Sequence, residues 1–473
     1  MQFLITYLIL SSFFISYVTD SLFGDVNLRQ IIYHVYFTFF QGQLWFDKRH
    51  VLKIFVYAAI LPFILSIVSF YLFKYFKKLN LINDKKIYSI LIILFLFNIS
   101  FLIYKYSIYD FYKYETETTN IYENHYKNPS LKQNTKKNLI LIYVESMENL
   151  FSKKEIFGKD LFSSIDNIDY NKYSFNKFYQ KLGTSWTIAG ITATQCGVPL
   201  SNFMYTKSNK FTYEVKEFMP NITCLGDILK NEGYYNVFVK SQDSRFAGTQ
   251  NFLNTHGYQE IIDKVYFEDS KEMSSDADSE LFKYLKNKIL KLEKINKPYN
   301  LTALTFDMHH LSDNDYKNES TNSHICKNLN GEIYNDNLEC VSLLVSDFIN
   351  FLIKNNILDN SVLVITGDHL SMKLTPDLKK FAGSQHKRTI KNYFFSKEKY
   401  KKNRDTIYHF DLLPTILHLL DFEFEEKRFG LGASGFDELS KNFILHKIDD
   451  NRSLNKELNG FSLKYNSFWK STK

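Results

Sequence analysis

The stretch Asn138-Leu-Ile-Leu-Ile-Tyr-Val-Glu145 is an apolar run that ends in a carboxylate, and Ser361-Val-Leu-Val-Ile-Thr-Gly-Asp368-His369 ends in a carboxylate and an imidazole. A short continuous apolar run is typical of a strand buried on both faces, as in a parallel sheet. In an open α/β sheet, the groups just beyond the C-terminal strand ends line one crevice, where ligands bind. We therefore expect Glu145, Asp368 and His369 to meet in one site.

The residue types at these strand ends indicate a metal site. Two carboxylates and an imidazole are suitable ligands for Mn²⁺, Mg²⁺ or Zn²⁺. The pattern therefore predicts metal-assisted chemistry. Each residue also has an ordinary alternative role, because Glu145 could cap a helix or form a salt bridge, and Asp368-His369 could be a polar strand end.

Helix and strand patterns alternate between the two runs. Thr223–Gly233 is typical of a helix with a glycine stop, Tyr235–Val239 of the strand after it, and Leu343–Ile353 of an amphipathic helix that leads into the second run. Repeated helix-then-strand units predict an α/β fold with a mostly parallel central sheet covered on both faces.

Length and charge limit the possible functions. The chain has 473 residues and a formal net charge of +7, so it has room for a membrane region and one large α/β domain. The positive charge is spread along the chain, and its densest short cluster in the second half is Lys397–Arg404. Because the sequence lacks a basic stripe interleaved with aromatic residues, we expect no nucleic-acid partner.

Residues 1–105 have the composition of a transmembrane region. Three apolar stretches, 1–18, 54–73 and 87–104, are each close to the ~20 residues that cross a bilayer core. Five lysines lie between the second and third stretches, which places that connection in the cytoplasm by the positive-inside rule. The first stretch lacks the basic start and the A-x-A-like cleavage site of a signal peptide, so we expect it to be retained.

This topology divides the chain into three parts. Residues 106–137, rich in polar residues and tyrosine, are predicted to form a linker or surface arm, and residues 138–473 a catalytic domain. The third membrane helix would place that domain outside the cytoplasm. We therefore predict a multi-pass protein of the bacterial inner membrane with its catalytic domain on the periplasmic side.

All four cysteines, Cys196, Cys224, Cys326 and Cys340, lie in the part predicted to be extracytoplasmic. An even number in an oxidising compartment suggests disulfides, with three possible pairings. We favour Cys326–Cys340, because the segment between them is polar and rich in Asn and Gly, and this leaves Cys196–Cys224. Free thiols in the core are the alternative.

The stretch Gly183–Gly190 offers candidate nucleophiles. A glycine-led turn rich in hydroxyl groups precedes a small-residue segment that could begin a helix. A helix N-terminus favours a bound phosphate, and a metal bound to a hydroxyl lowers its pKa. Residue chemistry alone leaves Thr184, Ser185 and Thr187 equal, and an ordinary helix cap remains the alternative for each.

Five short motifs occur in an order found in one superfamily. They are Tyr143-Val-Glu145-Ser146; Gly183–Gly190 with Gln195–Pro199; Arg245–Gly248 with Thr255–Tyr258; Asp307–His310; and Thr366–His369. Over roughly residues 138 to 440 the chain resembles the membrane-anchored members of the alkaline phosphatase/sulfatase superfamily. Within that superfamily it most resembles the phosphoglycerol transferases of periplasmic glucans, which are related to lipoteichoic acid synthase. The sulfatase nucleophile motif, C/S-x-P-x-R, is absent, so sulfate-ester hydrolysis is not expected.

The resemblance implies roles for individual residues. Thr187 would be the nucleophile and would join Glu145, Asp368 and His369 around one divalent cation. The expected cation is Mn²⁺, with Mg²⁺ or Zn²⁺ as alternatives. His309 would lie at the phosphoryl group, as a substrate ligand or a proton donor. The predicted substrate-binding residues are Trp186, Thr249, Arg245 and Lys240. Trp186 could shape the pocket. Thr249 stands where relatives carry a basic residue, and Arg245 or Lys240 could supply the missing positive charge.

The resemblance also implies a reaction. Glycerol phosphate would pass from phosphatidylglycerol to a periplasmic glucan or another envelope glycan through a phospho-threonine intermediate, and the bilayer would supply the donor lipid. The alternative is a phosphoethanolamine transferase acting on lipid A or another envelope acceptor. A scaffold without enzymatic activity would be expected to lack some of the ligands, and all four are present.

Overall fold

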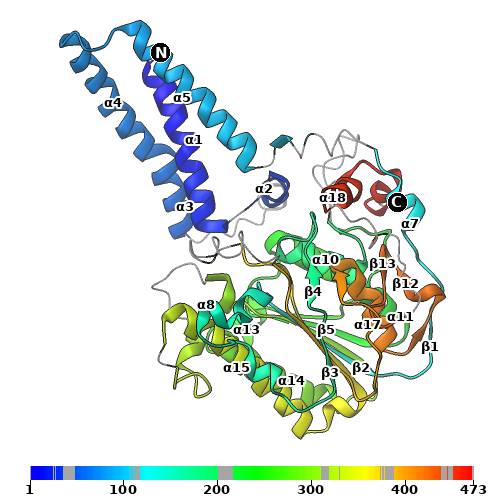
Figure 1. Ribbon diagram of the computed structural model, residues 1–473. Helices are drawn as coiled ribbons and strands as arrows, with labels where there is room; N and C mark the ends of the chain where they lie inside the picture. Colours follow the sequence, from blue (N-terminus) through cyan, green and yellow to red (C-terminus); the bar gives the residue numbers. More distant parts are fainter. Residues whose placement is uncertain are drawn as a thin grey trace. The chain divides into compact units, whose positions relative to one another are not determined.

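A computed structural model describes most of the chain. The residues outside the described part are 1, 25, 27, 36–47, 107, 110, 111, 113–117, 201–216, 311–318, 330, 373, 375–377, 379–387, 438–444, 446–450 and 471–473. The chain divides into two compact units, Met1–Thr116 and Glu117–Lys473 (Figure 1).

The first unit is helical. Its described helices are α1 (Gln2–Phe23), α2 (Leu28–Val35), α3 (Lys48–Phe55), the π-helical turn η2 (Val56–Ile60), α4 (Leu61–Lys78) and α5 (Asp84–Lys105). Three segments, Gln2–Ser21, Leu52–Lys78 and Asp84–Lys105, are long and apolar enough to cross a membrane, and the expectation of three apolar N-terminal helices is confirmed.

Polar contacts join two of these long helices. The Ser12 hydroxyl donates to Asn98 Oδ1 at 2.7 Å, and Lys105 Nζ lies 2.5 Å from Asp20 Oδ2. Hydrogen bonds of this kind hold apolar helices together where the hydrophobic effect between them is weak.

The second unit is built on a seven-stranded sheet with the strand order β3-β9-β8-β2-β7-β5-β6. The five parallel strands are β8 (Ser361–Gly367), β2 (Asn138–Val144), β7 (Tyr299–Leu304), β5 (Tyr235–Lys240) and β6 (Glu260–Ile262). At the edge beyond β8, β9 (Asn392–Phe395) and β3 (Lys172–Tyr173) pair antiparallel to their neighbours. The predicted α/β fold with a mostly parallel sheet is confirmed, and two short strands make the sheet mixed.

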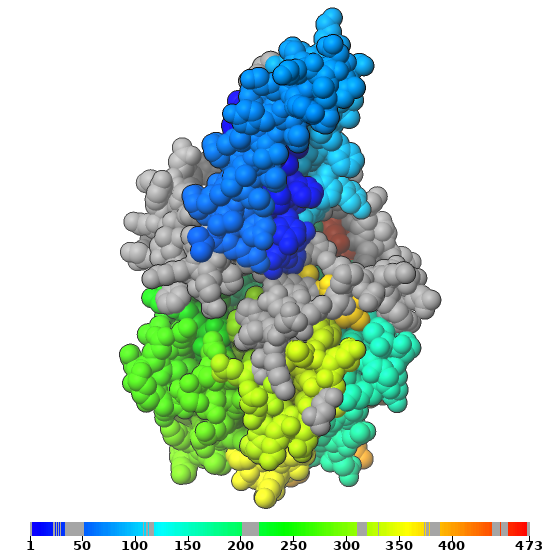
Figure 2. Space-filling view, turned by 90° about the vertical axis from the view of Figure 1, so that its left-hand side faces the viewer, coloured from blue at the N-terminus to red at the C-terminus, as the bar shows by residue number. Residues whose placement is uncertain are grey.

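Helices cover both faces of the sheet (Figure 1). One layer contains α13 (Lys264–Ser270), α14 (Asp278–Leu292) and α15 (Ile333–Lys354), and Figure 2 looks onto this side. The other contains α10 (Thr187–Cys196), α11 (Leu225–Asn231) and α17 (Leu412–Leu419). Side chains of β2 alternate between the layers: Ile140 and Ile142 join the core with α14 and α15, whereas the Tyr143 hydroxyl lies 2.6 Å from Thr194 Oγ1 of α10.

The segment predicted as a linker contains short elements that pack within the second unit. Helix α7 (Ile121–His125) contacts the C-terminal segment, where the Tyr122 hydroxyl donates to Leu458 O at 2.5 Å. Strand β1 (Lys132–Gln133) pairs antiparallel with β11 (Phe422–Glu423). Residues after Glu117 therefore belong to the folded second unit.

The remaining elements are short. They are α8 (Lys154–Phe157), α9 (Ser163–Asp166), β4 (Lys177–Tyr179), α12 (Thr249–Thr255), β10 (Thr406–Tyr408), β12 (Arg428–Phe429), β13 (Gly432–Ala433), α18 (Asn451–Asn459) and α19 (Leu463–Phe468). The structure contains the disulfides Cys196–Cys224 and Cys326–Cys340, which are the two pairs that the sequence favours.

Candidate active site

The pairing of two central strands brings the predicted ligands together. Strands β2 and β8 are parallel neighbours, and their register pairs Val144 with Gly367. Glu145 and Asp368, the residues immediately after these two strands, therefore lie at the same edge of the sheet. Both side chains are buried, with 2% and 0% exposure, so their charges are largely shielded from water.

Helix α10 adds the hydroxyl group of Thr187, the first residue of the helix. The Thr187 Oγ1 atom lies 3.5 Å from Glu145 Oε2 and 3.5 Å from His369 Nε2. Gly190 permits this approach, because a Cβ atom at that position would lie 2.1 Å from Asp368 O. Of the three candidate hydroxyls, Thr187 faces the ligands, and the Thr184 hydroxyl donates to Lys181 O at 2.7 Å. The Ser185 hydroxyl is buried and has no hydrogen-bond partner among the described residues.

Hydrogen bonds orient each ligand so that one atom remains available. Asp368 Oδ1 accepts the backbone N–H groups of Ser146 and His369, each at 2.9 Å. Asp368 Oδ2 is buried and accepts no hydrogen bond from the described residues. His369 Nδ1 lies 2.9 Å from Leu370 O, which places a proton on Nδ1 and leaves Nε2 to face the carboxylates.

The spacing of these atoms suits a small divalent cation. His369 Nε2 lies 3.4 Å from Asp368 Oδ2 and 3.5 Å from Thr187 Oγ1, which in turn lies 3.5 Å from Glu145 Oε2. Four ligands at bond lengths of about 2.1 Å in a tetrahedron lie about 3.4 Å apart. A buried carboxylate oxygen without a donor is costly unless it has another partner. The residues therefore fit the cation that the sequence predicts.

Burial and mutual repulsion control the charges at the site. Burial, with the nearby Asp368 carboxylate, raises the pKa of Glu145 from its ordinary value of 4.5 to about 7. Burial disfavours the charged form of His369, but the carboxylates of Asp368 and Glu145 outweigh it and raise the pKa of His369. The neighbouring carboxylates contribute to both shifts, and a bound cation would neutralise this negative charge.

Lys240, predicted to bind substrate, lies at the end of β5 and is 7% exposed. Burial lowers the pKa of Lys240 to about 8, while the carboxylates of Asp263, Asp243, Glu145 and Asp368 oppose this shift. The ammonium group is therefore within electrostatic range of two of the ligand carboxylates.

The structure also gives the contacts or burial of the other predicted substrate-binding and catalytic residues. The Arg245 guanidinium forms hydrogen bonds to both oxygens of Asp243, and the Thr249 hydroxyl donates to Phe246 O. Trp186, immediately before α10, is buried. The ring of His309 stacks on Phe306, with centroids 5.2 Å apart.

Three supporting groups were not predicted from the sequence. Ser146 contacts both Glu145 and Asp368. The buried Glu148 carboxylate accepts two hydrogen bonds from Arg388, at 2.8 and 2.5 Å. Asp278 accepts the backbone N–H groups of Phe306 and Asp307. The sequence offers no pattern for these contacts, because the partners come from different segments or depend on local backbone turns.

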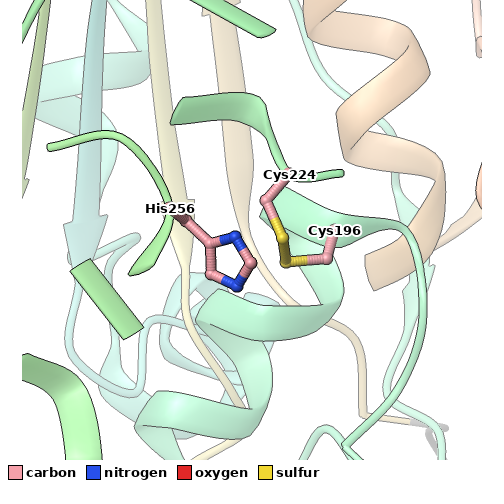
Figure 3. Close-up of side chains that lie close together, drawn as sticks. All are labelled: Cys196, Cys224 and His256. Carbon is pink, nitrogen blue, oxygen red and sulfur yellow. A yellow bond between two sulfur atoms is a disulfide. The ribbon is translucent and has the colours of Figure 1, made fainter. Parts of the chain in front are cut away.

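A second buried cluster also contains three potential metal ligands: Cys196, Cys224 and His256. Figure 3 shows the His256 imidazole beside the disulfide between the two cysteines. His256 Nδ1 lies 2.8 Å from Asp227 Oδ2, and Nε2 lies 2.8 Å from Phe218 O. The ligand atoms of this cluster are therefore already engaged.

The site belongs to a domain with known relatives. The family model described as Sulfatase matches residues 137–422, more than half of the chain. The chain belongs to the sulfatase family. The matched region contains both ligand-bearing strands and helix α10.

Named sulfatase-family relatives include phosphoglycerol transferases. The chain is 32% identical over 271 residues to phosphoglycerol transferase I of Escherichia fergusonii, which covers 53% of this chain and 33% of that protein. The enzyme of the same name from Xanthomonas axonopodis is 28% identical over 262 residues, covering 52% and 36%. The chain thus matches about a third of the length of these curated relatives.

Solved structures similar to this chain include one synthase and one transferase. The lipoteichoic acid synthase LtaP of Listeria monocytogenes has a TM-score of 0.49 and 18% identity, covering 64% of this chain and 76% of that one. The phosphoglycerol transferase GacH of Streptococcus pyogenes has a TM-score of 0.46 and 15% identity, covering 72% and 87%.

Proposed function

We propose that this sulfatase-family chain is a phosphoglycerol transferase that moves glycerol phosphate from phosphatidylglycerol to a periplasmic glucan or another envelope glycan. The observation that carries the proposal is the position of the Thr187 hydroxyl, 3.5 Å from both Glu145 and His369 at the N-terminus of α10. The matches to phosphoglycerol transferase I support the choice of transferred group.

One divalent cation would be held by Glu145, Asp368, His369 and Thr187, and we propose Mn²⁺, with Mg²⁺ or Zn²⁺ as alternatives. When bound, the cation lowers the pKa of the Thr187 hydroxyl and offsets negative charge on the phosphoryl oxygens. The tied oxygens of Glu145 and Asp368 keep the two carboxylates in place without movement during the reaction.

The first step transfers the phosphoryl group to the protein. Thr187 Oγ1, which would have released its proton to water before this step, forms a bond to phosphorus while the bond from phosphorus to the diacylglycerol oxygen breaks. We assign His309 to the proton that the departing oxygen requires. Lys240, whose charge is within range of the ligand carboxylates, would attract the anionic phosphodiester, and Trp186 would form a wall beside the nucleophile.

The second step regenerates the threonine. An acceptor hydroxyl attacks phosphorus, His309 accepts its proton, and the bond between Thr187 and phosphorus breaks. Because His309 gives a proton in one step and receives one in the other, it returns to its starting state after each turnover.

The membrane region fits this chemistry. Three helices are long and apolar enough to span a bilayer, and the lysines between the second and third indicate a cytoplasmic connection. We propose a multi-pass inner-membrane protein whose domain from residue 138 onward is periplasmic. Residence in the membrane that supplies the donor lipid would keep enzyme and donor together throughout the reaction.

The test is mass spectrometry of the full-length protein in detergent, loaded with Mn²⁺ and incubated separately with phosphatidylglycerol and phosphatidylethanolamine. We expect a glycerol-phosphate adduct on the peptide that contains Thr187, and no adduct in Thr187→Ala. Thr187→Ser, which keeps a hydroxyl, is the matched control and should retain some adduct.

Two other results have distinct meanings. An ethanolamine-phosphate adduct on the same peptide would replace the donor and favour the alternative, a phosphoethanolamine transferase acting on lipid A or another envelope acceptor. No adduct with either lipid in a metal-loaded protein would contradict the proposed donor class, and full transfer by Thr187→Ala would remove Thr187 from the mechanism.

A further inference from the structure

Ser146 follows Glu145 directly and has an unusual backbone conformation. Its φ angle is 55°, in the left-handed region that favours glycine and disfavours other residues. Its side chain is 4% exposed. A buried serine at a position that glycine would occupy with less strain suggests that the hydroxyl group is used.

The left-handed turn lets this one residue contact both neighbouring carboxylates. The Ser146 backbone N–H donates to Asp368 Oδ1 at 2.9 Å, across from β2 to the end of β8. The Ser146 hydroxyl donates back to Glu145 Oε1 at 2.7 Å. Ser146 therefore joins the two strand ends that supply the carboxylates.

These bonds decide which oxygen atoms remain available. Because Glu145 Oε1 accepts the Ser146 hydroxyl, Oε2 is the oxygen that lies beside Thr187 Oγ1. Because Asp368 Oδ1 accepts two backbone N–H groups, Oδ2 is the oxygen left without a donor among the described residues.

We propose that Ser146 is a positioning residue whose hydroxyl fixes Glu145 for cation binding and thereby sets the affinity of the site. The inference rests on the cation site of the proposed function and adds a residue that acts through a ligand without binding the cation itself. Hydrogen bonds to metal ligands typically contribute a factor of about 10–100 to metal affinity.

The test compares two variants in the full-length, metal-stripped protein by isothermal titration with Mn²⁺. Ser146→Gly keeps the backbone N–H and accepts the left-handed conformation, so it removes the side chain without adding strain. Ser146→Ala removes the hydroxyl and keeps the strain. We expect the Mn²⁺ dissociation constant to rise about 10–100-fold in both, while the metal-free Ser146→Gly protein melts at or above the wild-type temperature.

Two controls separate this role from a general loss of stability. Ser164→Ala removes a hydroxyl that lies beside Ser342 Oγ, on another part of the domain, and should leave the dissociation constant unchanged. Glu145→Ala removes a ligand and should abolish binding. A wild-type dissociation constant in Ser146→Gly would overturn the role of the hydroxyl.

The proposed function and this inference can fail separately. If the wild-type protein binds Mn²⁺ through Glu145 but both Ser146 variants bind equally well, the inference fails and the cation site stands. If the wild-type protein binds no Mn²⁺, Mg²⁺ or Zn²⁺ at a Glu145-dependent site, the cation site fails and the inference fails with it.

Discussion

Two buried groups in this protein each contain three side chains that could bind a metal ion: Glu145, Asp368 and His369 in one, and Cys196, Cys224 and His256 in the other. In the first, Asp368 Oδ2 has no hydrogen-bond donor among the described residues, and His369 Nε2 faces the carboxylates. In the second, the sulfurs form a disulfide (Figure 3). Both groups are buried and consist of residue types that can bind metals, and they differ in whether ligand atoms remain available.

His256 makes the contrast sharper. Both of its ring nitrogens already have partners at 2.8 Å, the Asp227 carboxylate and the Phe218 carbonyl, so neither is left to face a metal ion. Proximity and residue type therefore do not identify a metal site on their own, and the hydrogen-bond partners of each ligand atom decide between a metal centre and a structural cluster.

The largest expected effect is loss of a ligand from the first group. Asp368→Asn should lower transferase activity by on the order of 10³-fold or more, because the cation site loses an anionic ligand and the charge it balances. The metal-free variant should be at least as stable as the wild type, since a buried, repelling carboxylate becomes neutral. Lipid transfer and thermal melting in a chelator measure the two effects.

The disulfide of the second group should affect stability and leave metal binding intact. Closing a loop between residues 28 apart contributes about 3–4 kcal/mol in the chain-entropy model. Cys196→Ala/Cys224→Ala should therefore lower the free energy of unfolding by about that amount, with an unchanged Mn²⁺ dissociation constant, as measured by denaturant unfolding and titration.

The other disulfide is the matched control. Cys326 and Cys340 are 14 residues apart, so their removal should cost slightly less, about 3 kcal/mol. The contrast would be contradicted if zinc raised the melting temperature of the chemically reduced wild-type chain but not that of the variant in which Cys196 and Cys224 are alanine. The second group would then be a metal site too.

The third prediction concerns pH and the metal-free protein. The folded-state pKa of Glu145 is raised to about 7 by burial and by Asp368. The stability this group contributes is therefore fully present below its ordinary value of 4.5 and is lost as pH rises through about 7. The raised pKa of His369 acts in the same direction. The free energy of unfolding should fall from pH 5 to pH 8 by on the order of 1–3 kcal/mol.

Glu145→Gln is the variant that checks this assignment. The substitution keeps the shape of the side chain and removes its titration. The free energy of unfolding of this variant, measured by denaturant unfolding, should therefore fall less steeply with pH than that of the wild type. Saturating Mn²⁺ should reverse the trend in the wild type, because the cation requires deprotonated ligands and binds more tightly as pH rises. An equal slope in both metal-free proteins would contradict the assignment to Glu145.

The smallest expected effect concerns the segment that contains His309, the proposed proton donor. Asp278 is buried and accepts the backbone N–H groups of Phe306 and Asp307 at 2.8 and 3.1 Å. Phe306 stacks on the His309 ring. Asp278→Asn should lower kcat by about 10-fold, since the amide nitrogen that replaces one carboxyl oxygen cannot accept a hydrogen bond from one of the two N–H groups.

Measuring the Mn²⁺ affinity of the Asp278 variant separates an effect on the His309 segment from an effect on the metal ligands. Asp278 supports the loop of the proposed proton donor, so its variant should bind Mn²⁺ like the wild type while kcat falls. A parallel loss of Mn²⁺ affinity would show that Asp278 supports the metal ligands as well, which would contradict a role confined to the segment of the proposed proton donor.

Strand pattern made the centre of the site predictable from sequence. The apolar runs before Glu145 and Asp368 are long enough to identify buried strands, and parallel pairing then brings their ends together. The edge strands β3 and β9 were not predicted, because β3 has only two residues and β9 four. Short strands of this kind depend on their neighbours and leave no periodic pattern.

Other features depend on contacts that sequence patterns do not encode. Arg388 pairs with Glu148 over a separation of 240 residues, and α7 packs against a C-terminal segment more distant still. Ser146 lacks the usual signature of a left-handed turn, which is Gly or Asn. Its role follows from the position of two carboxylates, one of which lies far away in sequence.

The most direct test of the contrast between the two groups is anomalous X-ray diffraction from crystals of the full-length protein soaked in Mn²⁺. We expect one strong anomalous peak within about 2.2 Å of Glu145 Oε2, Thr187 Oγ1, Asp368 Oδ2 and His369 Nε2, and no peak at Cys196, Cys224 and His256. A peak at the second group, or none at the first in crystals saturated with Mn²⁺, would contradict the assignment of the metal site.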